Sequence, residues 1–362
     1  MTQDIHQSTV AYEAWLGGFM QPVARDLQLK HKLMRKNAFT FFRATFYRWA
    51  ELWPRVPAAI ADAPAVLGVG DAHVENFGTW RDREGRLVWG VNDFDEAAEL
   101  PYTSDLVRLA VSSLLARNAG MVMTAEAPML AALVQGYAAG LAQGGTPFVI
   151  EEQNAWLRKL AHSNLRAPRR YWASLNAIDT WTGSVPKRAA ELLHDVPRGA
   201  ELAKVVHRIS GAGSLGRPRL AALFVWRGGY LAREVKARAP SAWARVSDPA
   251  TTTSKATLPR VWKYAVRCQD PFLKATRYWI VRRLAPDCSR IDLEELPKKR
   301  QEMALFRAMG WEIANVHCGS PNLAAVRQHL ATLPHDWLDE ASELMRSTLD
   351  DEFRDWKQSR DR

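Results

Sequence analysis

The sequence predicts a two-lobed α+β protein in which a β-rich lobe interrupts a mainly helical chain. Three observations predict this fold class. Apolar and aromatic residues recur at helical spacing over residues 21–53 and again from residue 296 onward. Residues 203–240 instead have the residue pattern of three strands, joined by a glycine-rich turn and by an Arg-Gly-Gly turn. A chain of 362 residues with 47% hydrophobic content is large enough for two lobes.

The change in residue pattern along the chain predicts three segments. We expect residues 1–195 to form a helical lobe that carries two polar loops, which we interpret below as catalytic and metal-binding. Residues 196–290 form the small β-rich lobe, and residues 291–362 form C-terminal helices that return to the helical lobe. This division follows the switch from helical periodicity to short runs of β-favouring residues and back.

Several shorter elements can be predicted within these segments. Residues 65–70 read as a buried strand, and residues 74–95 read as a hairpin with a polar turn. Residues 102–118 are expected to form an amphipathic helix. Residues 277–284 are a further strand candidate in the β-rich segment. Candidates for the N-cap of the helix are Thr103, Ser104 and Asp105.

The positive charge of the chain is compatible with several anionic partners. A formal net charge of +10 and a pI near 9.6 suit nucleic acid, but they suit a nucleotide equally well. The arginines are dispersed and lack a helix-turn-helix, zinc-finger or RNA-recognition signature, which disfavours nucleic acid. The three cysteines form no CxxC pair, which argues against a zinc site or a disulfide framework. Without a bilayer-length apolar run or a signal pattern, we expect a cytoplasmic protein with no membrane partner.

Gly68–Gly78, with the sequence GVGDAHVENFG, concentrates polar side chains between glycines. Phosphoryl transfer from ATP requires a carboxylate that orients the nucleophile, together with oxygen ligands for magnesium. In the kinase catalytic loop the Asp precedes the Asn by five positions, and Asp71 and Asn76 have this separation. Asp93 and Asp95 follow at the end of the predicted hairpin, where in a strand they would face the same side. Both are candidate metal ligands, and the sequence does not rank them.

A simpler interpretation stays open for each of these residues. Asp71 and Asn76 could form an Asx-rich turn, and Asp93 could cap another. His73 is a catalytic candidate in the same loop, with orientation of the loop by hydrogen bonds as its alternative role. The combination of these residues with an intervening hairpin favours a phosphoryl-transfer site over an ordinary turn.

The second motif is SGAGSLG, in which three glycines follow the spacing GxGxxG. A dinucleotide site requires a helix after this motif, whereas Pro218 and a β-rich run follow here. A strand, a glycine turn and a second strand form the arrangement with which kinases cover the ATP phosphates. A lysine for the phosphates belongs on the third strand, where a solvent-facing lysine is the alternative. The candidate nucleotide-binding residues are Gly211, Gly213, Ser214, Gly216 and Lys236.

The stretches GDAHVENFG, NDFDEA, SGAGSLG and REVKARAPS resemble the bacterial family called domain of unknown function 2252. That family is similar in motif to aminoglycoside and choline kinases. The resemblance covers most of the chain and implies a protein kinase-like fold with ATP and Mg²⁺ as cofactors. It also implies that Asp71 is the catalytic base and that Asp105 braces the catalytic loop. The implied magnesium ligands are Asn76 and Asp93, and the implied phosphate-binding residues are Gly211, Gly213, Gly216 and Lys236.

Two departures from the family pattern keep a second interpretation open. The family commonly has Glu where this chain has Ala237, and no Glu follows Lys236 before Glu294, although kinases pair this lysine with a helix Glu. A pseudokinase that binds nucleotide, or serves as an interaction module without catalysis, is therefore the alternative. Because an unpaired buried ammonium group is costly, we expect another carboxylate beside Lys236. The candidates are Asp248 and Asp270, with Glu234 less favoured.

The order of the motifs predicts a circular permutation of the kinase arrangement. In ordinary kinases the glycine turn and its lysine precede the catalytic loop, but here Asp71 lies far ahead of Gly211. Met309–Ser320 resembles the helix that runs into the catalytic loop of small-molecule kinases, yet it lies near the end of the sequence. The cut is expected between the helix ending at His317 and the Asp71 loop, with both motif clusters facing one cleft. The sequence thus predicts an ATP- and magnesium-dependent phosphotransferase for a small hydroxyl-bearing substrate that it does not identify.

Overall fold

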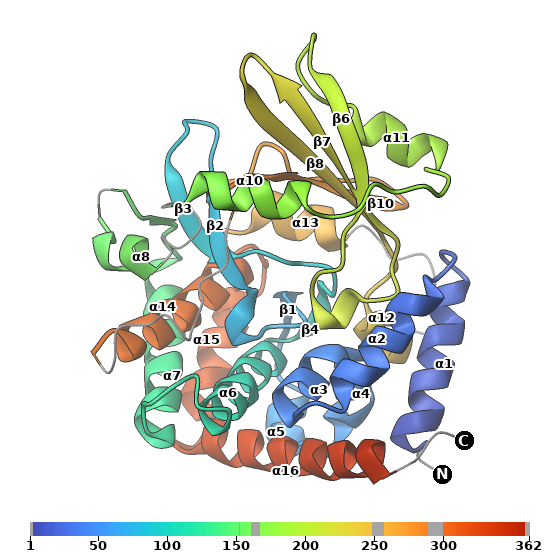
Figure 1. Ribbon diagram of the computed structural model, residues 1–362. Helices are drawn as coiled ribbons and strands as arrows, with labels where there is room; N and C mark the ends of the chain where they lie inside the picture. Colours follow the sequence, from blue (N-terminus) through green and yellow to red (C-terminus); the bar gives the residue numbers. More distant parts are fainter. Residues whose placement is uncertain (1–2, 152, 161–166, 248–256, 289–299, 359–362) are drawn as a thin grey trace.

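A five-stranded antiparallel sheet lies at one end of the molecule, and most of the helices occupy the other end (Figure 1). The computed structural model describes residues 3–151, 153–160, 167–247, 257–288 and 300–358. Across these ranges, no helix combines the length and apolar character needed to cross a membrane. The combination of helices with several small sheets confirms the mixed α and β composition that the sequence predicts.

The five-stranded sheet is formed by the glycine-rich region of the chain. Its strands, in spatial order, are β6 (Glu201–His207), β7 (Arg219–Trp226), β8 (Gly229–Ala237), β10 (Trp279–Leu284) and β9 (Lys274–Ala275). This arrangement confirms the three predicted strands and the additional strand near residue 280. Val235 packs on α11 (Lys187–Leu193) on one face, whereas Ala232 lies with α10 (Pro168–Asn176) in a separate apolar cluster.

The two polar loops lie around a β-hairpin between this sheet and the helices (Figure 1). β1 (Ala65–Gly68) pairs with β4 (Ala98–Pro101), so the ends of the polar region are joined. Between them, β2 (Phe77–Arg81) pairs with β3 (Leu87–Val91), and β3 also pairs with β5 (Phe148–Val149). The predicted strand and hairpin are confirmed, and a short turn of 3₁₀ helix, η2, leads from the first polar loop into β2.

The helical part of the molecule is built around α6 (Tyr102–Asn118). The prediction of an amphipathic helix is wrong for this element, because residues 102–116 are all buried. The predicted side-chain N-cap is also wrong: Pro101 is the N-cap residue and Thr103 donates its hydroxyl to the Ile60 carbonyl. The polar side chains of α6 are therefore occupied inside the molecule rather than exposed to water.

Other helices surround α6 and complete the core. Towards the N-terminus they are α1 (Ile5–Gly17), α2 (Ala24–Met34), α3 (Ala38–Ala44), α4 (Phe46–Leu52), α5 (Ala58–Ala61) and α7 (Glu126–Gln143). The short helices along the middle of the chain are α8 (Ala155–Leu160), α12 (Ala242–Ser247) and α13 (Thr257–Tyr264). At the end of the chain they are α14 (Arg300–His317), α15 (Leu323–Thr332) and α16 (Trp337–Gln358).

Close packing between α7 and α14 fixes the position of the α14 C-terminus. Gly310 of α14 lies so close to the backbone of α7 that an added β-carbon would overlap the Leu133 carbonyl group. Gly136 of α7 meets the Arg307 carbonyl group of α14 in the same way. Two glycines on facing helices allow the backbones to approach closely. The end of α14, with His317, is thereby held beside the first polar loop.

Candidate functional site

The loop that carries Asp71 is held in place by the carboxylate of Asp105. One carboxylate oxygen accepts a hydrogen bond from the Val69 amide at 2.7 Å, and the other accepts from the Gly70 amide at 2.8 Å. Nε2 of His317, at the end of α14, lies 3.0 Å from the same carboxylate. Asp105 is fully buried. It therefore contacts the loop backbone directly, which is the geometry that a bracing residue requires.

Three polar residues of α6 face the loop that carries Asp71 at helical spacing. Asp105 holds the loop backbone before Asp71, Arg108 binds the Asp71 side chain, and the Ser112 hydroxyl accepts a hydrogen bond from the Val74 amide at 3.1 Å. Positions separated by three and four residues share one face of a helix. The polar stripe of α6 is thus a support for the loop, and this explains why the helix carries polar residues yet is buried.

Arg108 is a site residue that the sequence interpretation missed. Its Nε and Nη2 atoms donate to Oδ1 of Asp71 at 3.0 and 2.7 Å, and its guanidinium group lies 3.7 Å from the centre of the Phe42 ring. Burial raises the pKa of Asp71, although the charge of Arg108 acts in the opposite direction. An arginine between apolar neighbours, three positions after Asp105, was the available signal, because a buried charge requires a partner.

The second oxygen of Asp71 faces the opposite side of the loop. Oδ2 lies 3.9 Å from Nε2 of His73, which exceeds hydrogen-bond distance. It also lies 3.6 Å from the point where a β-carbon of Gly213 would stand. Asp71 therefore has one oxygen fixed by Arg108 and one directed toward the glycine turn. His73 is buried next to Asp71, and its catalytic role remains a prediction.

Asn76 connects the two acidic loops through its carboxamide group. Its Nδ2 atom donates to the Asp71 carbonyl at 3.1 Å and to the Asp93 carbonyl at 2.9 Å. Its Oδ1 atom accepts from the Asp93 amide at 2.8 Å. This side chain fixes the two loops relative to each other, although 17 positions separate Asn76 from Asp93. A carbonyl oxygen has two lone pairs, so Oδ1 retains one for a further partner.

Lys236 of β8 forms ion pairs with both carboxylates of the second loop. Its Nζ atom lies 3.2 Å from Oδ2 of Asp93 and also pairs with Asp95. The expectation of a carboxylate other than a helix Glu is confirmed. Asp270 is a wrong candidate, since its carboxylate accepts from the Phe272 amide, and Asp248 lies outside the described residues. The aspartates stand in a turn after β3 rather than in a strand, because β3 ends at Val91.

The surroundings of the two aspartates shift their pKa values in opposite directions. Burial acts to raise the pKa of Asp93, but Lys236 and Arg282 together lower it well below its usual range. Burial and the neighbouring Asp93 raise the pKa of Asp95. Burial also lowers the pKa of Lys236. Asp93 therefore holds negative charge most strongly, which favours it as the first ligand for a cation.

The glycine turn lies directly over the loop that carries Asp71. Gly211 and Gly216 have φ angles of +75° and +95°, which strongly favour glycine. A β-carbon on Gly213 would stand 2.8 Å from the Arg43 carbonyl oxygen. The Ser214 hydroxyl accepts a hydrogen bond from Nη2 of Arg219 at 2.6 Å, so it helps to fix the turn. The predicted residues of the two motifs, far apart in sequence, are thus close together in space.

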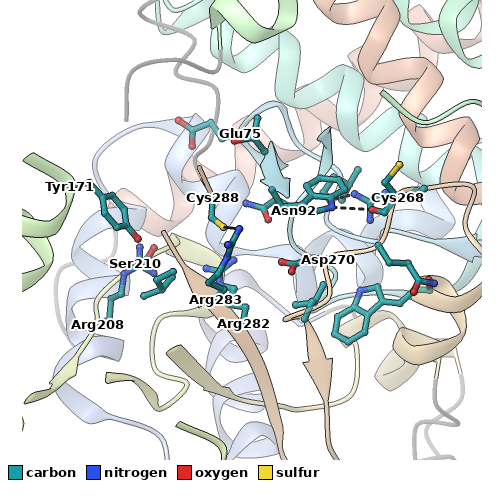
Figure 2. A pocket seen from close by; sticks show the side chains of 18 of the residues that line it. Glu75, Asn92, Tyr171, Arg208, Ser210, Cys268, Asp270, Arg282, Arg283 and Cys288 are labelled. Atoms are coloured by element: carbon teal, nitrogen blue, oxygen red, sulfur yellow. Dashed lines mark hydrogen bonds between the residues drawn. The ribbon is translucent and has the colours of Figure 1, made fainter. Parts of the chain in front are cut away.

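Three cavities follow one another through this region. A small cavity of about 50 Å³ is lined by both motif clusters, including Asp71, Asp93 and Gly213. A narrow cavity of about 10 Å³ is lined by Asp93, Asp95, Lys236 and Arg282. Arg282 also lines a large cavity of about 990 Å³ between β10 and the β2–β3 hairpin (Figure 2). The acidic pair therefore stands between the small and the large cavity.

The large cavity has a basic and aromatic lining. Six basic side chains line it, against two acidic ones. Aromatic side chains also line it, and Figure 2 shows Tyr171 on the same side as Arg208 and Ser210. The basic residues are Arg170, Arg208, Lys263, Arg267, Arg282 and Arg283, and the aromatic residues are Trp80, Tyr171 and Trp262. Such a lining suits a ligand with both a flat apolar part and an anionic part.

The ion pair of Arg108 with Asp71 predicts a pH-dependent loss of stability. In Arg108→Met the buried Asp71 carboxylate has no cation, so we expect the free energy of unfolding to fall by about 3–5 kcal/mol near neutral pH. The loss should shrink as the pH falls, because protonation removes the uncompensated charge. Denaturant titration measures both effects. Arg117→Met, on the partly exposed end of the same helix, should cost less than about 1 kcal/mol, and equal losses in the two variants would contradict this account.

Comparison with known proteins identifies a family. No curated protein and no solved structure matches the chain. One family model, described as an uncharacterized protein conserved in bacteria, matches residues 22–164 and 152–362. The two matches together cover both the loop that carries Asp71 and the glycine turn. The chain therefore belongs to the bacterial family called domain of unknown function 2252 (DUF2252).

Proposed function

We propose that the protein is an ATP- and magnesium-dependent phosphotransferase that acts on a small hydroxyl-bearing molecule. The observation that carries this proposal is the convergence of two distant motifs on one small cavity. Asp71, Asn76 and Asp93 come from the region before residue 100, whereas the glycine turn and Lys236 come from residues beyond 210. Carboxylates, a glycine turn and a lysine are the groups with which kinases position and activate phosphates.

Asp71 is suited to the role of general base. Its Oδ1 atom is fixed by Arg108, so the side chain cannot rotate freely, and Oδ2 remains directed into the small cavity. Burial raises its pKa above the ordinary value for Asp. A base whose pKa lies closer to the working pH accepts a proton more effectively. Oδ2 is therefore the atom that would accept the proton of the acceptor hydroxyl.

The donor atoms around Asp93 fit a magnesium ion. Mg²⁺ prefers oxygen ligands, and the site offers the carboxylates of Asp93 and Asp95 with the carboxamide oxygen of Asn76 beside them. Two carboxylates share one ammonium group in the ion-free arrangement. A divalent cation at the pair would compete with Lys236, which would then be available for phosphate oxygens. Bound magnesium would supply charge neutralisation for the phosphates.

The large cavity is the best place for the nucleotide. Its volume of about 990 Å³ lies within the range of small-molecule pockets. Aromatic residues such as Trp262 suit a base, and the basic residues suit phosphates. Arg282 lines both this cavity and the narrow one that leads to Asp93. The phosphates would therefore extend from the large cavity toward Asp93 and Lys236.

A permuted kinase-like fold is part of the same proposal. Ser320, just beyond α14, accepts a hydrogen bond from the Leu67 amide of β1 at 2.8 Å, and Asn322 donates to the Ala65 carbonyl at 2.6 Å. A helix late in the sequence thus ends beside the strand that leads into the catalytic loop. The chain ends also lie near each other, with the His6 ring stacked on Trp356 at 4.6 Å (Figure 1). Neighbouring surface termini are the condition under which permutation is tolerated.

One observation favours a second candidate, a pseudokinase-type module that binds nucleotide without catalysis. The small cavity holds only about 50 Å³, because the glycine turn lies against Asp71 and the Arg43 carbonyl. Phosphate transfer at Asp71 would require the turn to move away. A protein in which the turn never moves could bind a nucleotide in the large cavity and transfer nothing. Binding and turnover must therefore be measured separately.

Magnesium dependence of nucleotide binding tests the proposed metal ligands. We expect Mg·ATP to bind more tightly than ATP alone, and Asp93→Ala to remove this difference because the strongest ligand for the ion is lost. Isothermal titration calorimetry with and without Mg²⁺ measures both. Asp62→Ala, at an exposed position far from this cluster in sequence, is the matched control and should retain the difference. Absence of any heat from ATP at millimolar concentration would rule out the proposal.

Turnover by Asp71→Asn separates the phosphotransferase from the non-catalytic module. We expect this variant to bind Mg·ATP like the unaltered protein and to lose about 10²–10⁴-fold in turnover, since a general base acts in the chemical step. Turnover of the unaltered protein should rise with pH through a pKa above the usual value for Asp, because only the ionised carboxylate accepts a proton. Phosphate release from ATP, with and without hydroxyl-bearing acceptors, provides the assay. If the unaltered protein binds but never turns over ATP, the second candidate is correct.

A further inference from the structure

Glu234 is a buried carboxylate that contacts three arginines. Its carboxylate accepts from Nη1 of Arg208 at 2.6 Å and from Nε of Arg282 at 2.8 Å. A third guanidinium group, that of Arg219, lies 3.7 Å away. Only 1% of Glu234 is exposed. Burial acts to raise its pKa, but the three arginines hold the pKa well below the usual range for Glu. Glu234 is therefore ionised, and the cluster carries two excess positive charges.

The strand register places this cluster beside Lys236. Glu234 and Lys236 are two positions apart on β8 and so share one face of the sheet. Arg282 of β10 stands opposite Glu234, and Arg219 of β7 stands opposite Lys236. Arg208 follows β6, and its amide donates to the Arg219 carbonyl. Four cations and one carboxylate thus occupy the same side of the sheet, where the glycine turn begins and ends.

Two of the three arginines border the large cavity. Arg208 and Arg282 line it, and Figure 2 shows both among its lining side chains. Their side chains are 25% and 18% exposed, whereas that of Arg219 is only 3% exposed. Glu234 binds one amino group of Arg208 and the Nε atom of Arg282. Each guanidinium group therefore keeps further N–H donors for a second acceptor.

The charge balance of the region requires an anion once a metal binds. Five cations (Lys236, Arg217 and the three arginines) face four carboxylates (Glu234, Asp93, Asp95 and Glu96), an excess of one positive charge. A divalent cation at the aspartates would raise this excess to three. Buried charges need compensation, and the anionic groups of a polyphosphate can provide it. The large cavity is the open side from which such a group can reach Arg208 and Arg282.

We propose that Glu234 is a positioning residue that holds Arg208 and Arg282 as the phosphate-binding wall of the large cavity. This inference rests on the proposed function and adds the groups that bind the nucleotide phosphates. In ordinary kinases a helix Glu positions the lysine, whereas here Asp93 and Asp95 pair with Lys236. Glu234, on the lysine strand, instead fixes two guanidinium groups beside the lysine. Preorganised guanidinium groups lose little freedom when they bind phosphate.

Three probes in the presence of Mg²⁺ test this assignment: ATP, adenosine and inorganic tripolyphosphate, each titrated by calorimetry. We expect Arg282→Gln and Arg208→Gln each to weaken ATP and tripolyphosphate binding about tenfold or more, as loss of a charge-assisted hydrogen bond implies, while adenosine binding is unchanged. Arg188→Gln is the matched control, because Arg188 is an exposed arginine of α11 that lines none of the three cavities and is not among the partners of Glu234. It should change all three affinities by less than about twofold.

Glu234→Gln distinguishes positioning from simple charge attraction. The substitution adds one net positive charge, so charge attraction alone predicts tighter binding of tripolyphosphate. Positioning predicts weaker binding, because the arginines lose the anion that aligns them. Thermal unfolding checks that the Glu234→Gln variant is folded. If it is not folded, the Arg208→Gln and Arg282→Gln variants alone test the inference. Tighter binding by a folded Glu234→Gln variant would overturn the inference.

The remaining outcomes separate this inference from the proposed function. If ATP binds but its affinity is insensitive to Arg208 and Arg282, the phosphate wall is wrong and the nucleotide site stands. Tripolyphosphate could instead bind through these arginines while adenosine does not bind and ATP binds no more tightly than tripolyphosphate. In that case the phosphate-binding role of the arginines is correct and the nucleotide function is wrong. If the unaltered protein binds none of the probes, both are wrong. An Arg188→Gln effect as large as the others would also overturn the specific role of Glu234.

Discussion

The buried ion pair of Lys236 with Asp93 and Asp95 is the interaction on which the rest of the site depends. It joins the face of the five-stranded sheet to the loop after β3, and so brings residues from two distant parts of the chain together. Asn76 joins the loop after β3 to the loop that carries Asp71, and Asp105 fixes that second loop to α6. Loss of both aspartates would leave the buried Lys236 ammonium group without its carboxylate partners, which is a large cost. The geometry of the candidate site and the stability of the fold are therefore coupled.

The same ion pair limits what the cluster can bind. Lys236 is paired with the two aspartates, and the glycine turn lies on the loop that carries Asp71. Phosphate groups would have to replace the aspartates as partners of Lys236, and a cation would have to replace Lys236 as partner of the aspartates. Exchange of partners in a buried cluster is favourable only when both replacements arrive together. This gives a physical reason to expect that nucleotide and magnesium bind cooperatively in the proposed function.

The sequence predicted local relations between residues well. It placed Asp71 and Asn76 five positions apart in one loop and Lys236 on the third strand of the sheet, because a loop or a strand largely fixes such relations. The carboxylate partners of Lys236 could not be predicted from the sequence. A turn after β3 directs both aspartates toward a strand some 140 positions away, and no local pattern records that contact. Arg108 was missed, and α6 was wrongly predicted to be amphipathic, for one reason. Its polar residues follow helical spacing, and spacing cannot distinguish water from a buried polar loop as the partner of that face.

A crystal structure of the protein with Mg²⁺ and a non-hydrolysable ATP analogue tests the central claim most directly. The account predicts the metal ion on Asp93 and the phosphates between the Gly211–Gly216 turn, Lys236 and Arg282, with the base in the large cavity. It also predicts that Lys236 leaves the aspartates for the phosphates. A nucleotide bound elsewhere, or bound in the large cavity with the metal absent and the ion pair of Lys236 with Asp93 and Asp95 intact, would contradict the account.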